Sequence, residues 1–410
     1  MANQNRLEQD IETLRNISDP CDGGVTRIGL TPRYRQGVNY IKAQMQAVGL
    51  TIREDEVGNV YGIMQGTHPT LPSIISGSHL DTVKNAGAFD GIAGVVCALE
   101  VARMLKEQNI QLKHNYEVVA FVEEEGTHFG TVLLGSRYIT GELNEVDKDR
   151  LRNDEGQTLR QILQQYSTGV TTISAKRDPQ TIKAFLELHD EQGPVLEATK
   201  TDIGIVDNIV AIGQLVITIT GFAGHAGTVP MTMRQDAGIA GCQFVSHLNQ
   251  YTLRKYAEQA TLTVGKFSLS PNSANTIPNQ CTFTLDIRSG DEKIVHNIIK
   301  HVSSLALIIN DEFNVVCEVK QVSFKDPVVM DSGLRQLLQA TAEDLGLSVR
   351  HLNSGAGHDA MIMSGICPTA MIFIPCYKGI THHPDENVTW QDMAKGTDVL
   401  FNTIIQLDKK

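Results

Sequence analysis

The sequence predicts an α/β protein in which a larger domain, with a mixed and largely parallel sheet flanked by helices, is interrupted by an inserted α+β domain with an antiparallel sheet. The first half of the chain alternates short apolar runs with segments of helical periodicity. The middle is rich in alternating, β-branched segments, and the last part returns to helix and apolar strand. The 410 residues are enough for two domains with buried cores.

Three apolar runs in the first half predict strands, and each run ends in polar residues. They are residues 72–80 (PSIISGSHL), 115–125 (NYEVVAFVEEE) and 183–194 (KAFLELHDEQGP). Residues 90–109 carry apolar side chains at helical spacing, which predicts a helix that starts at a capping position, Asp90-Gly91. Strand–helix–strand order favours a partly parallel sheet, and such sheets place functional side chains at the carboxyl ends of their strands.

The middle of the chain predicts the inserted antiparallel domain. Residues 213–227, 260–271, 279–289 and 313–324 read as strands, and residues 291–310 read as a helix. Residues 332–346 and 387–406 then predict helices on either side of a short strand at 369–375. We therefore expect one domain split between residues 1–211 and 326–410, with the insert at residues 212–325.

Composition narrows the classes of function. A net charge of -12 argues against a nucleic-acid surface, which needs a basic footprint. No run approaches the roughly 18–20 apolar residues of a membrane span, and the amphipathic N-terminal segment lacks the apolar core of a secretory signal. The seven cysteines are scattered without a CxxC pair, so we expect reduced thiols in a cytoplasmic protein.

Histidines and carboxylates recur at five separated places, mostly at the ends of predicted strands. These candidate metal ligands are His79, Asp90, Glu125, His189 and His382. They suit a pair of borderline divalent ions, and the two oxygens of Asp90 could bridge ions at the ~3.5–4 Å spacing of two-metal hydrolases. Asp81 is placed to accept the second ring N–H of His79. Taken alone, His79 with Asp81 and Asp90 is more often a structural histidine beside solvated carboxylates, and the other ligand positions favour a metal site.

The neighbouring carboxylates Glu124 and Glu125 point different ways at a strand end. One could bind metal while the other acts as the general base for an attacking water, as metal-assisted amide hydrolysis requires. For the glutamates at 123–125 taken alone, a solvated acidic turn is the favoured interpretation.

Several motifs together resemble the hydantoinase/carbamoylase family of metal-dependent amidohydrolases, which is related to aminoacylases and carboxypeptidase-type metallopeptidases. In chain order they are GSHLDTV, FDG, EEEG, ELHDEQGPVLE, GHAGTVPM, DIRS, SGAGHDA and THHPDE. The resemblance spans nearly the whole chain. It implies two divalent ions per chain, a catalytic domain with an inserted lid and dimerisation domain, a homodimer through the insert, and cleavage of a carbamoyl or ureido C–N bond in a small carboxylate substrate.

The resemblance also implies a role for each ligand. His79, Asp90 and His189 would hold one ion, and Asp90, Glu125 and His382 the other. Glu124 matches the catalytic base. His382 is preferred to His383 because it lies two residues before Pro384, although a second histidine directly after it is unusual. Zn²⁺ or Mn²⁺ suits this set, and Co²⁺ or Ni²⁺ is possible.

Substrate recognition is implied in the same way. The matching positions are Gln192, His225, Asn275, Arg288, Gly357 and His358. Arg288 and Asn275 would hold the substrate carboxylate, for which a planar, two-pronged donor is suited. His225 would polarise the scissile carbonyl. Without the resemblance, Arg288 reads as half of a surface salt bridge and His225 as a turn residue.

Departures from the family pattern occur at His128 and Gly224 and in the segments at residues 206–213 and 227–237, and they affect the substrate while leaving the metal ligands intact. Residues 227–237 (GTVPMTMRQDA) resemble the members that hydrolyse allantoate and ureidoglycolate more than many carbamoylases. The sequence leaves allantoate and an N-carbamoyl-L-amino acid open as substrates. An aminoacylase or dipeptidase is the alternative enzyme, and a metal-binding homologue without activity is the alternative outside catalysis. A degenerate homologue should have lost a ligand or the base, and none is lost here.

Overall fold

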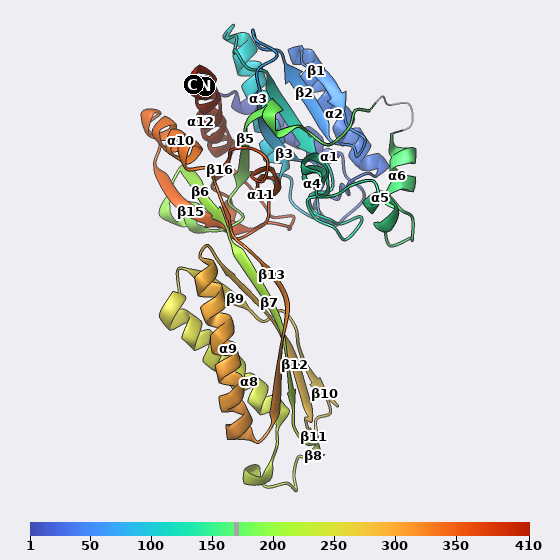
Figure 1. The fold of residues 1–410 in the computed structure, drawn as a ribbon, viewed down its shortest axis with the longest axis vertical. Helices are drawn as coiled ribbons and strands as arrows, with labels where there is room; N and C mark the ends of the chain where they lie inside the picture. The colour runs from blue at the N-terminus through green and yellow to red at the C-terminus, as the bar shows by residue number, and fades with distance from the viewer. Residues whose placement is uncertain (168–171) are drawn as a thin grey trace. The chain divides into compact units, whose positions relative to one another are not determined.

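A computed structural model describes residues 1–167 and 172–410 of the chain (Figure 1). The described chain forms two compact units. Unit 1 comprises Met1–Asp207, Met330–Leu352 and Gly357–Lys410, and unit 2 comprises Asn208–Val329 with Asn353–Ala356. The outer segments of the chain therefore share one unit, and the segment between them forms the other. Assigning catalytic, lid and dimerisation roles to these units stays a prediction.

Unit 1 alternates strands and helices along the chain. Its strands are β1 (Thr51–Glu54), β2 (Val60–Met64), β3 (Ser73–His79), β4 (Tyr116–Phe121), β5 (Ile182–Asp190), β6 (Ile203–Ile209, which runs into unit 2), β15 (Val349–Ser354, likewise) and β16 (Thr369–Ile374). Its α-helices are α1 (Gln4–Asn16), α2 (Pro32–Val48), α3 (Ile92–Glu107), α4 (Leu134–Thr140), α5 (Asp147–Arg150), α6 (Leu159–Tyr166), α7 (Val195–Thr199), α10 (Ser332–Asp344), α11 (Asp359–Met363) and α12 (Trp390–Lys409).

These strands belong to a nine-stranded sheet with a parallel centre. The order is β1-β2-β4-β3-β5-β16-β6-β14, and β15 also pairs with β6. The pairs β4–β3, β3–β5 and β5–β16 are parallel, whereas β1, β2, β6 and β14 pair antiparallel toward the two sides. The mixed, largely parallel sheet predicted from the sequence is confirmed.

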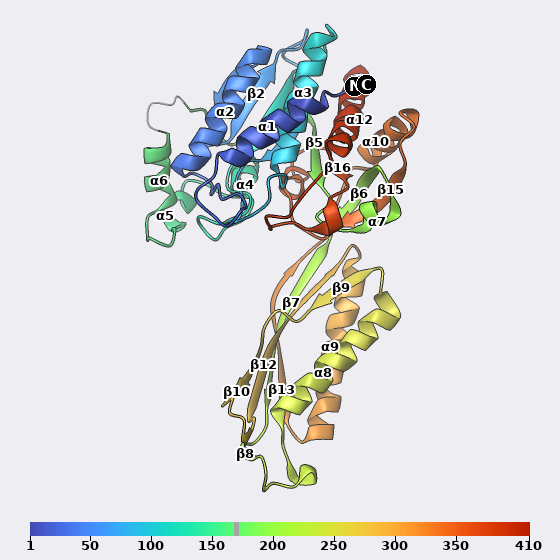
Figure 2. The same ribbon diagram turned by 180° about the vertical axis from the view of Figure 1, so that it is seen from behind.

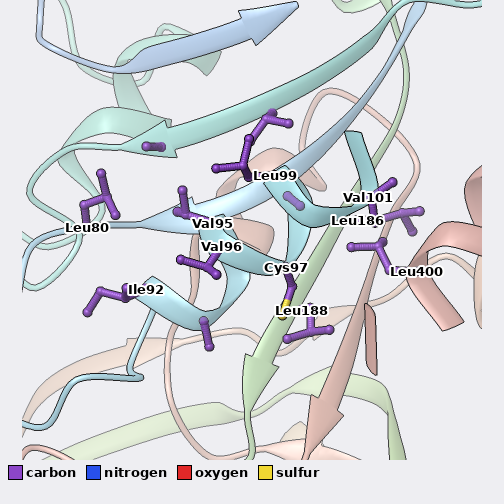
Figure 3. Close-up of a cluster of buried hydrophobic side chains, with 14 of the residues drawn as sticks. Leu80, Ile92, Val95, Val96, Cys97, Leu99, Val101, Leu186, Leu188 and Leu400 are labelled. Carbon is purple, nitrogen blue, oxygen red and sulfur yellow. The ribbon is translucent and has the colours of Figure 1, made fainter. Parts of the chain in front are cut away.

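The core of unit 1 lies between this sheet and its helices. Strands β3, β4 and β16 are buried along their whole length, which explains their unbroken apolar runs. Helix α3 is buried from Ile92 to Leu105 because it packs on the sheet on one side and on α12 on the other. Figure 3 shows its side chains beside Leu186 and Leu188 of β5 and Leu400 of α12. This packing fixes the loop that enters α3.

The predicted helix start is confirmed, with Gly91 at the N-cap position. Helix α3 begins after Gly91, and no side chain caps it. Asp90 does not serve as the cap because its carboxylate turns toward three histidines instead.

Unit 2 contains an antiparallel sheet with two long helices on one face (Figures 1 and 2). Its elements are β7 (Ala211–Thr220), β8 (Gly224–His225), α8 (Ala237–Tyr256), β9 (Ala260–Thr263), β10 (Phe267–Ser270), β11 (Thr276–Ile277), β12 (Gln280–Ser289), α9 (Glu292–Phe313), β13 (Val316–Lys325) and β14 (Val328–Val329). The sheet order is β10-β12-β7-β13, with β9 beside β12, and β8 pairs separately with β11. The separate antiparallel sheet is thus also confirmed. The run at 260–271 forms two strands, β9 and β10, rather than one.

Across the described residues, no helix combines the length and the apolar character needed to span a membrane.

Candidate dinuclear metal site

The candidate ligands lie at one edge of the unit 1 sheet. His79 ends β3, Glu125 follows β4 and His189 lies near the end of β5. These three neighbouring strands run parallel, so their carboxyl ends meet at the same edge. Asp90 lies in the loop that enters α3, and His382 lies in the loop after β16, where its backbone has a φ of 55°.

Asp90 lies between two groups of these side chains. Its Oδ1 is 3.3 Å from Nε2 of His189 and 3.6 Å from Nε2 of His79. Its Oδ2 is 3.1 Å from Nε2 of His382, which is also 3.4 Å from Oε2 of Glu125. The structure therefore brings together His79, Asp90 and His189 as one group and Asp90, Glu125 and His382 as a second. One oxygen of Asp90 faces each group, which is the arrangement a bridging carboxylate requires.

The electrostatics of the cluster depend on burial and on close charge pairs. Burial alone would raise the pKa of Asp90, but hydrogen bonds with His189, His382 and His79 hold that pKa well below its usual range. Burial, reinforced by the charge of Asp90, raises the pKa of Glu125 to about 7. The hydrogen bond to Asp90 raises the pKa of His382 to about 9. Two buried carboxylates thus lie in one cluster, where a bound cation would favour their ionised forms.

The cluster fits divalent cations. Within each group, the ligand atoms lie within 4.8 Å of one another. Two buried oxygens, Oε1 of Glu125 and Oδ1 of Asp81, have no hydrogen-bond partner among the described residues. Imidazole nitrogens with carboxylate oxygens suit Zn²⁺ and several other divalent first-row ions.

The second ring nitrogens of two histidines are held by backbone carbonyl oxygens. Nδ1 of His79 lies 3.0 Å from the carbonyl oxygen of Asp81, but 3.9 Å from the carboxylate of Asp81. The predicted hydrogen bond from His79 to the Asp81 carboxylate is therefore wrong: the backbone carbonyl of Asp81 takes that place. The carboxylate accepts the amide N–H of Glu125 instead. Nδ1 of His189 lies 2.9 Å from the carbonyl oxygen of Asp190. Both contacts leave Nε2 as the nitrogen that faces the cluster.

The two glutamates before Glu125 face different surroundings. Oε2 of Glu124 is 3.8 Å from Nε2 of His79, so Glu124 faces the cluster. Burial raises the pKa of Glu124 well above its usual range. The carboxylate of Glu123 instead accepts the amide N–H groups of His128 and Phe129. Of the two, Glu124 is the one with its carboxylate beside a candidate ligand.

Two of the predicted substrate residues of unit 1, Gln192 and His358, contact candidate metal ligands. The Gln192 side-chain amide donates to Oδ2 of Asp90 at 2.9 Å. His358 is buried, and its ring packs edge-on against His189 with the centroids 4.5 Å apart. Gly357 is exposed, and a Cβ added there would meet no atom within 4 Å.

The predicted residues of unit 2 include a histidine and an asparagine on paired strands. His225 of β8 pairs with Thr276 of β11, directly after Asn275. The ring of His225 is exposed, and the amide of Gly227 donates to its Nδ1, which leaves Nε2 as the nitrogen that carries a proton. Oδ1 of Asn275 accepts from Ser273, which leaves its NH₂ group as a donor. Both side chains therefore offer N–H donors.

Arg288 is held by Asp286 on its own strand and by the backbone of Gly355. Its Nε and Nη2 donate to the carboxylate of Asp286, at 2.7 and 3.3 Å, and its Nη1 donates to the carbonyl oxygen of Gly355 at 2.7 Å. The expected alternative, a salt bridge, is therefore present. Among the described residues, these three bonds leave two of the five guanidinium N–H groups for another acceptor.

Comparison with known proteins assigns the family. The model of peptidase family M20/M25/M40 matches residues 75–406. The chain belongs to this family. It is 35% identical over 410 residues to an N-carbamoyl-L-amino-acid amidohydrolase of Paenarthrobacter aurescens, covering 100% of this chain and 99% of that protein. It is also 35% identical to an allantoate amidohydrolase of Escherichia coli, covering 98% and 97%.

A solved structure agrees with this assignment. A hydantoinase/carbamoylase family amidase from Burkholderia multivorans superposes with a TM-score of 0.94 at 30% identity, covering 100% of this chain and 98% of that one. The resemblance inferred from the motifs is confirmed, and these names do not favour the aminoacylase or dipeptidase alternative. Equal identity to relatives named for two different substrates leaves the substrate to be proposed.

Sequence reasoning missed several side chains around the ligands of this M20/M25/M40 protein. Glu386 is 2% exposed and accepts the amide N–H groups of Phe89 and Asp90. Thr381 donates its hydroxyl to Oδ2 of Asp90. The carboxylate of Asp190 lies 3.1 Å from Nδ1 of His189. The motif THHPDE contained the first two, but nothing in the spacing showed which partner each would contact.

The unusual residues also have local partners. His383 is exposed, and its Nδ1 accepts the amide N–H of Asp385, so it belongs to neither ligand group. The ring of His128 donates from Nδ1 to the carbonyl oxygen of Gly29 at 2.7 Å.

Proposed function

We propose that this chain is a dinuclear-metal amidohydrolase that hydrolyses a carbamoyl or ureido C–N bond of a small carboxylate substrate. The observation that carries the proposal is Asp90, whose two oxygens face two separate ligand groups within a family of amidohydrolases. The substrate is allantoate or an N-carbamoyl-L-amino acid. The products are ammonia and CO₂ together with the remaining amine or ureido compound.

The ligand set supports two divalent ions, with Zn²⁺ or Mn²⁺ as the first choice and Co²⁺ or Ni²⁺ as alternatives. Such ions, when bound, supply Lewis acidity for the substrate carbonyl and lower the pKa of water. His79, Asp90 and His189 would hold one, and Asp90, Glu125 and His382 the other.

Glu124 is the proposed general base. Its carboxylate would take the proton of the attacking water and pass it to the leaving nitrogen, as acid–base catalysis at an amide requires. Its buried position beside His79 supports this role, because a base must lie close to the reacting atoms while bulk water is excluded. Gln192, Gly357 and His358 are proposed to contact the substrate.

Three residues of unit 2 are proposed to recognise the substrate's polar groups. The Nε2–H of His225 would donate to the scissile carbonyl, where charge develops in the transition state. Arg288 and Asn275 would bind the carboxylate, and the N–H donors that their local bonds leave available support this role.

We propose that the chain forms a homodimer through unit 2. Strand β13 is ten residues long and lies at the edge of its sheet, and Val316 and Val322 on it are 59% and 58% exposed. A long edge strand with exposed apolar side chains invites pairing with a second chain. The seven unpaired cysteines support the expected cytoplasmic location.

Product release over a panel of substrates tests the proposed reaction. The metal-loaded protein would be assayed with allantoate, N-carbamoyl-L-amino acids, N-carbamoyl-β-alanine and ureidoglycolate for ammonia, and with N-acetyl-amino acids for free amino acid. We expect ammonia from allantoate or from an N-carbamoyl-L-amino acid. Turnover of N-acetyl-amino acids alone would contradict the proposal and favour an aminoacylase.

A further inference from the structure

Glu386 is a buried carboxylate that joins two loops distant in the sequence. It is 2% exposed, and its Oε1 accepts the amide N–H of Phe89 at 2.8 Å and that of Asp90 at 3.0 Å. Its Oε2 lies 3.3 Å from the hydroxyl of Thr381. The residue thus holds the backbone at Asp90 from the same loop that carries His382.

Thr381 extends the contact to the other end of Asp90. Its hydroxyl lies 3.0 Å from Oδ2 of Asp90, the oxygen that faces His382. Asp90 is therefore fixed twice, through its backbone N–H by Glu386 and through its carboxylate by Thr381. A carboxylate that faces two ligand groups must keep one orientation, and these two contacts restrict the rotation of the Asp90 side chain.

The backbone opposite Glu386 is shaped to receive its side chain. A Cβ added at Gly87 would lie 2.3 Å from Cβ, Cδ and Oε1 of Glu386. Such a distance is far inside van der Waals contact, so only glycine lets the carboxylate reach the amides of residues 89 and 90. This close fit indicates that the contact is specific.

We infer that Glu386 is a positioning residue that fixes Asp90 between the two ligand groups and thereby sets the affinity for metal. This inference rests on the metal site of the proposed function. Groups that orient metal ligands through hydrogen bonds typically contribute about 10–100-fold in metal affinity. Glu386 itself contacts backbone and hydroxyl groups and belongs to neither ligand group.

Metal titration of purified full-length variants tests the inference without measuring turnover. The probe is Zn²⁺ or Mn²⁺, whichever the wild-type chain binds at two ions per chain, and bound ions are counted in competition with a chelator. Glu386→Ala removes both amide acceptors and should weaken metal binding by about 10–100-fold. Glu386→Gln keeps an oxygen for the two amides and an NH₂ group for Thr381, so it should retain wild-type affinity.

Asp408 provides a matched control. Its carboxylate is 7% exposed and also accepts two successive backbone N–H groups, those of Lys113 and His114. These residues precede β4, whereas Glu124 and Glu125 follow it, so Asp408 lies at the opposite end of that strand. Asp408→Ala should lower the melting temperature and leave metal affinity unchanged.

Gly87→Ala gives a second route that leaves Glu386 in place. It should displace the Glu386 carboxylate and reproduce the loss of affinity, and it carries the test if Glu386→Ala does not fold. A folded Glu386→Ala or Gly87→Ala chain with wild-type affinity would overturn the inference, as would an equal loss in Asp408→Ala. A wild-type chain that binds neither ion would instead overturn the proposed metal site itself.

Discussion

Glu124 is the residue whose chemistry is tested most simply. Glu124→Gln keeps the size of the side chain and removes the proton acceptor, so kcat should fall by about 10²–10⁴-fold. Both ions should remain bound, because Glu124 belongs to neither ligand group. Steady-state kinetics with metal analysis of the same sample measures both quantities.

Glu123→Gln is the control for this change. Glu123 accepts two backbone N–H groups through Oε1, and a glutamine can keep both bonds. Its kcat should stay close to wild type. Near-normal turnover by Glu124→Gln, combined with a large loss in Glu123→Gln, would move the base to Glu123.

Arg288 is predicted to govern substrate affinity. Arg288→Lys should raise KM, because an ammonium group cannot reproduce a two-pronged contact with a carboxylate. Arg288→Ala should raise KM further, by about tenfold or more, since truncating one member of a charge pair leaves the other unpaired. A normal KM for Arg288→Ala would place the carboxylate elsewhere, and Arg234 would be the next residue to change.

Among single residues, the metal ligands were easier to predict from the sequence than the residues that hydrogen-bond to them. His79, Glu125 and His189 could be located because they end or follow apolar strands, and parallel strands bring such ends together. The partners of Asp90 could not be located in this way. Glu386 lies about 300 positions away and binds the backbone amide of Asp90, and a pattern of side chains gives no sign of such a bond. The Asp81 carboxylate was misassigned for the same reason, since a backbone carbonyl took its place.

The short paired strands β8 and β11 position His225. The pairing of His225 with Thr276 holds the imidazole beside Asn275, and the Gly227 amide fixes its tautomer. His225→Ala should lower kcat by about 10²–10³-fold, as for the loss of one oxyanion donor. Metal content should not change.

His68→Ala, which removes an exposed histidine of unit 1, controls for nonspecific effects and should leave kcat unchanged. If the His225→Ala variant had the same kcat and KM as the His68→Ala control, His225 would be only a turn residue.

The order of the elements was predictable, but not every element was. Unbroken apolar runs predicted the central strands β3, β4, β5 and β16, and alternating runs predicted the long strands of unit 2. Strands β1, β2, β6, β14 and β15 of the larger sheet were not predicted. Helix α8 was not predicted, since its small residues, including Gly238 and Gly241, dilute the apolar stripe. The structure explains Gly241: a Cβ there would lie 2.4 Å from Sγ of Cys281 on β12, so glycine permits close packing of α8 on the sheet.

For the whole molecule, the dimer proposed through β13 predicts complementation between chains. His225→Ala and Glu124→Gln chains should each be nearly inactive alone. Mixed under conditions of subunit exchange, they should regain part of the activity if His225 serves the partner's site, because such heterodimers then contain one complete set of residues. No regain in verified heterodimers would mean that His225 acts within its own chain.

The proposed two-metal amidohydrolase is tested most directly by titrating the metal-free protein with divalent metal while following ammonia release from the substrate identified in the panel. We expect no release without metal and a rise that reaches its plateau at two ions per chain. Asp90→Ala, which removes the shared ligand, should bind neither ion tightly and release no ammonia. Full ammonia release by wild-type protein shown by elemental analysis to contain no transition metal would contradict the account.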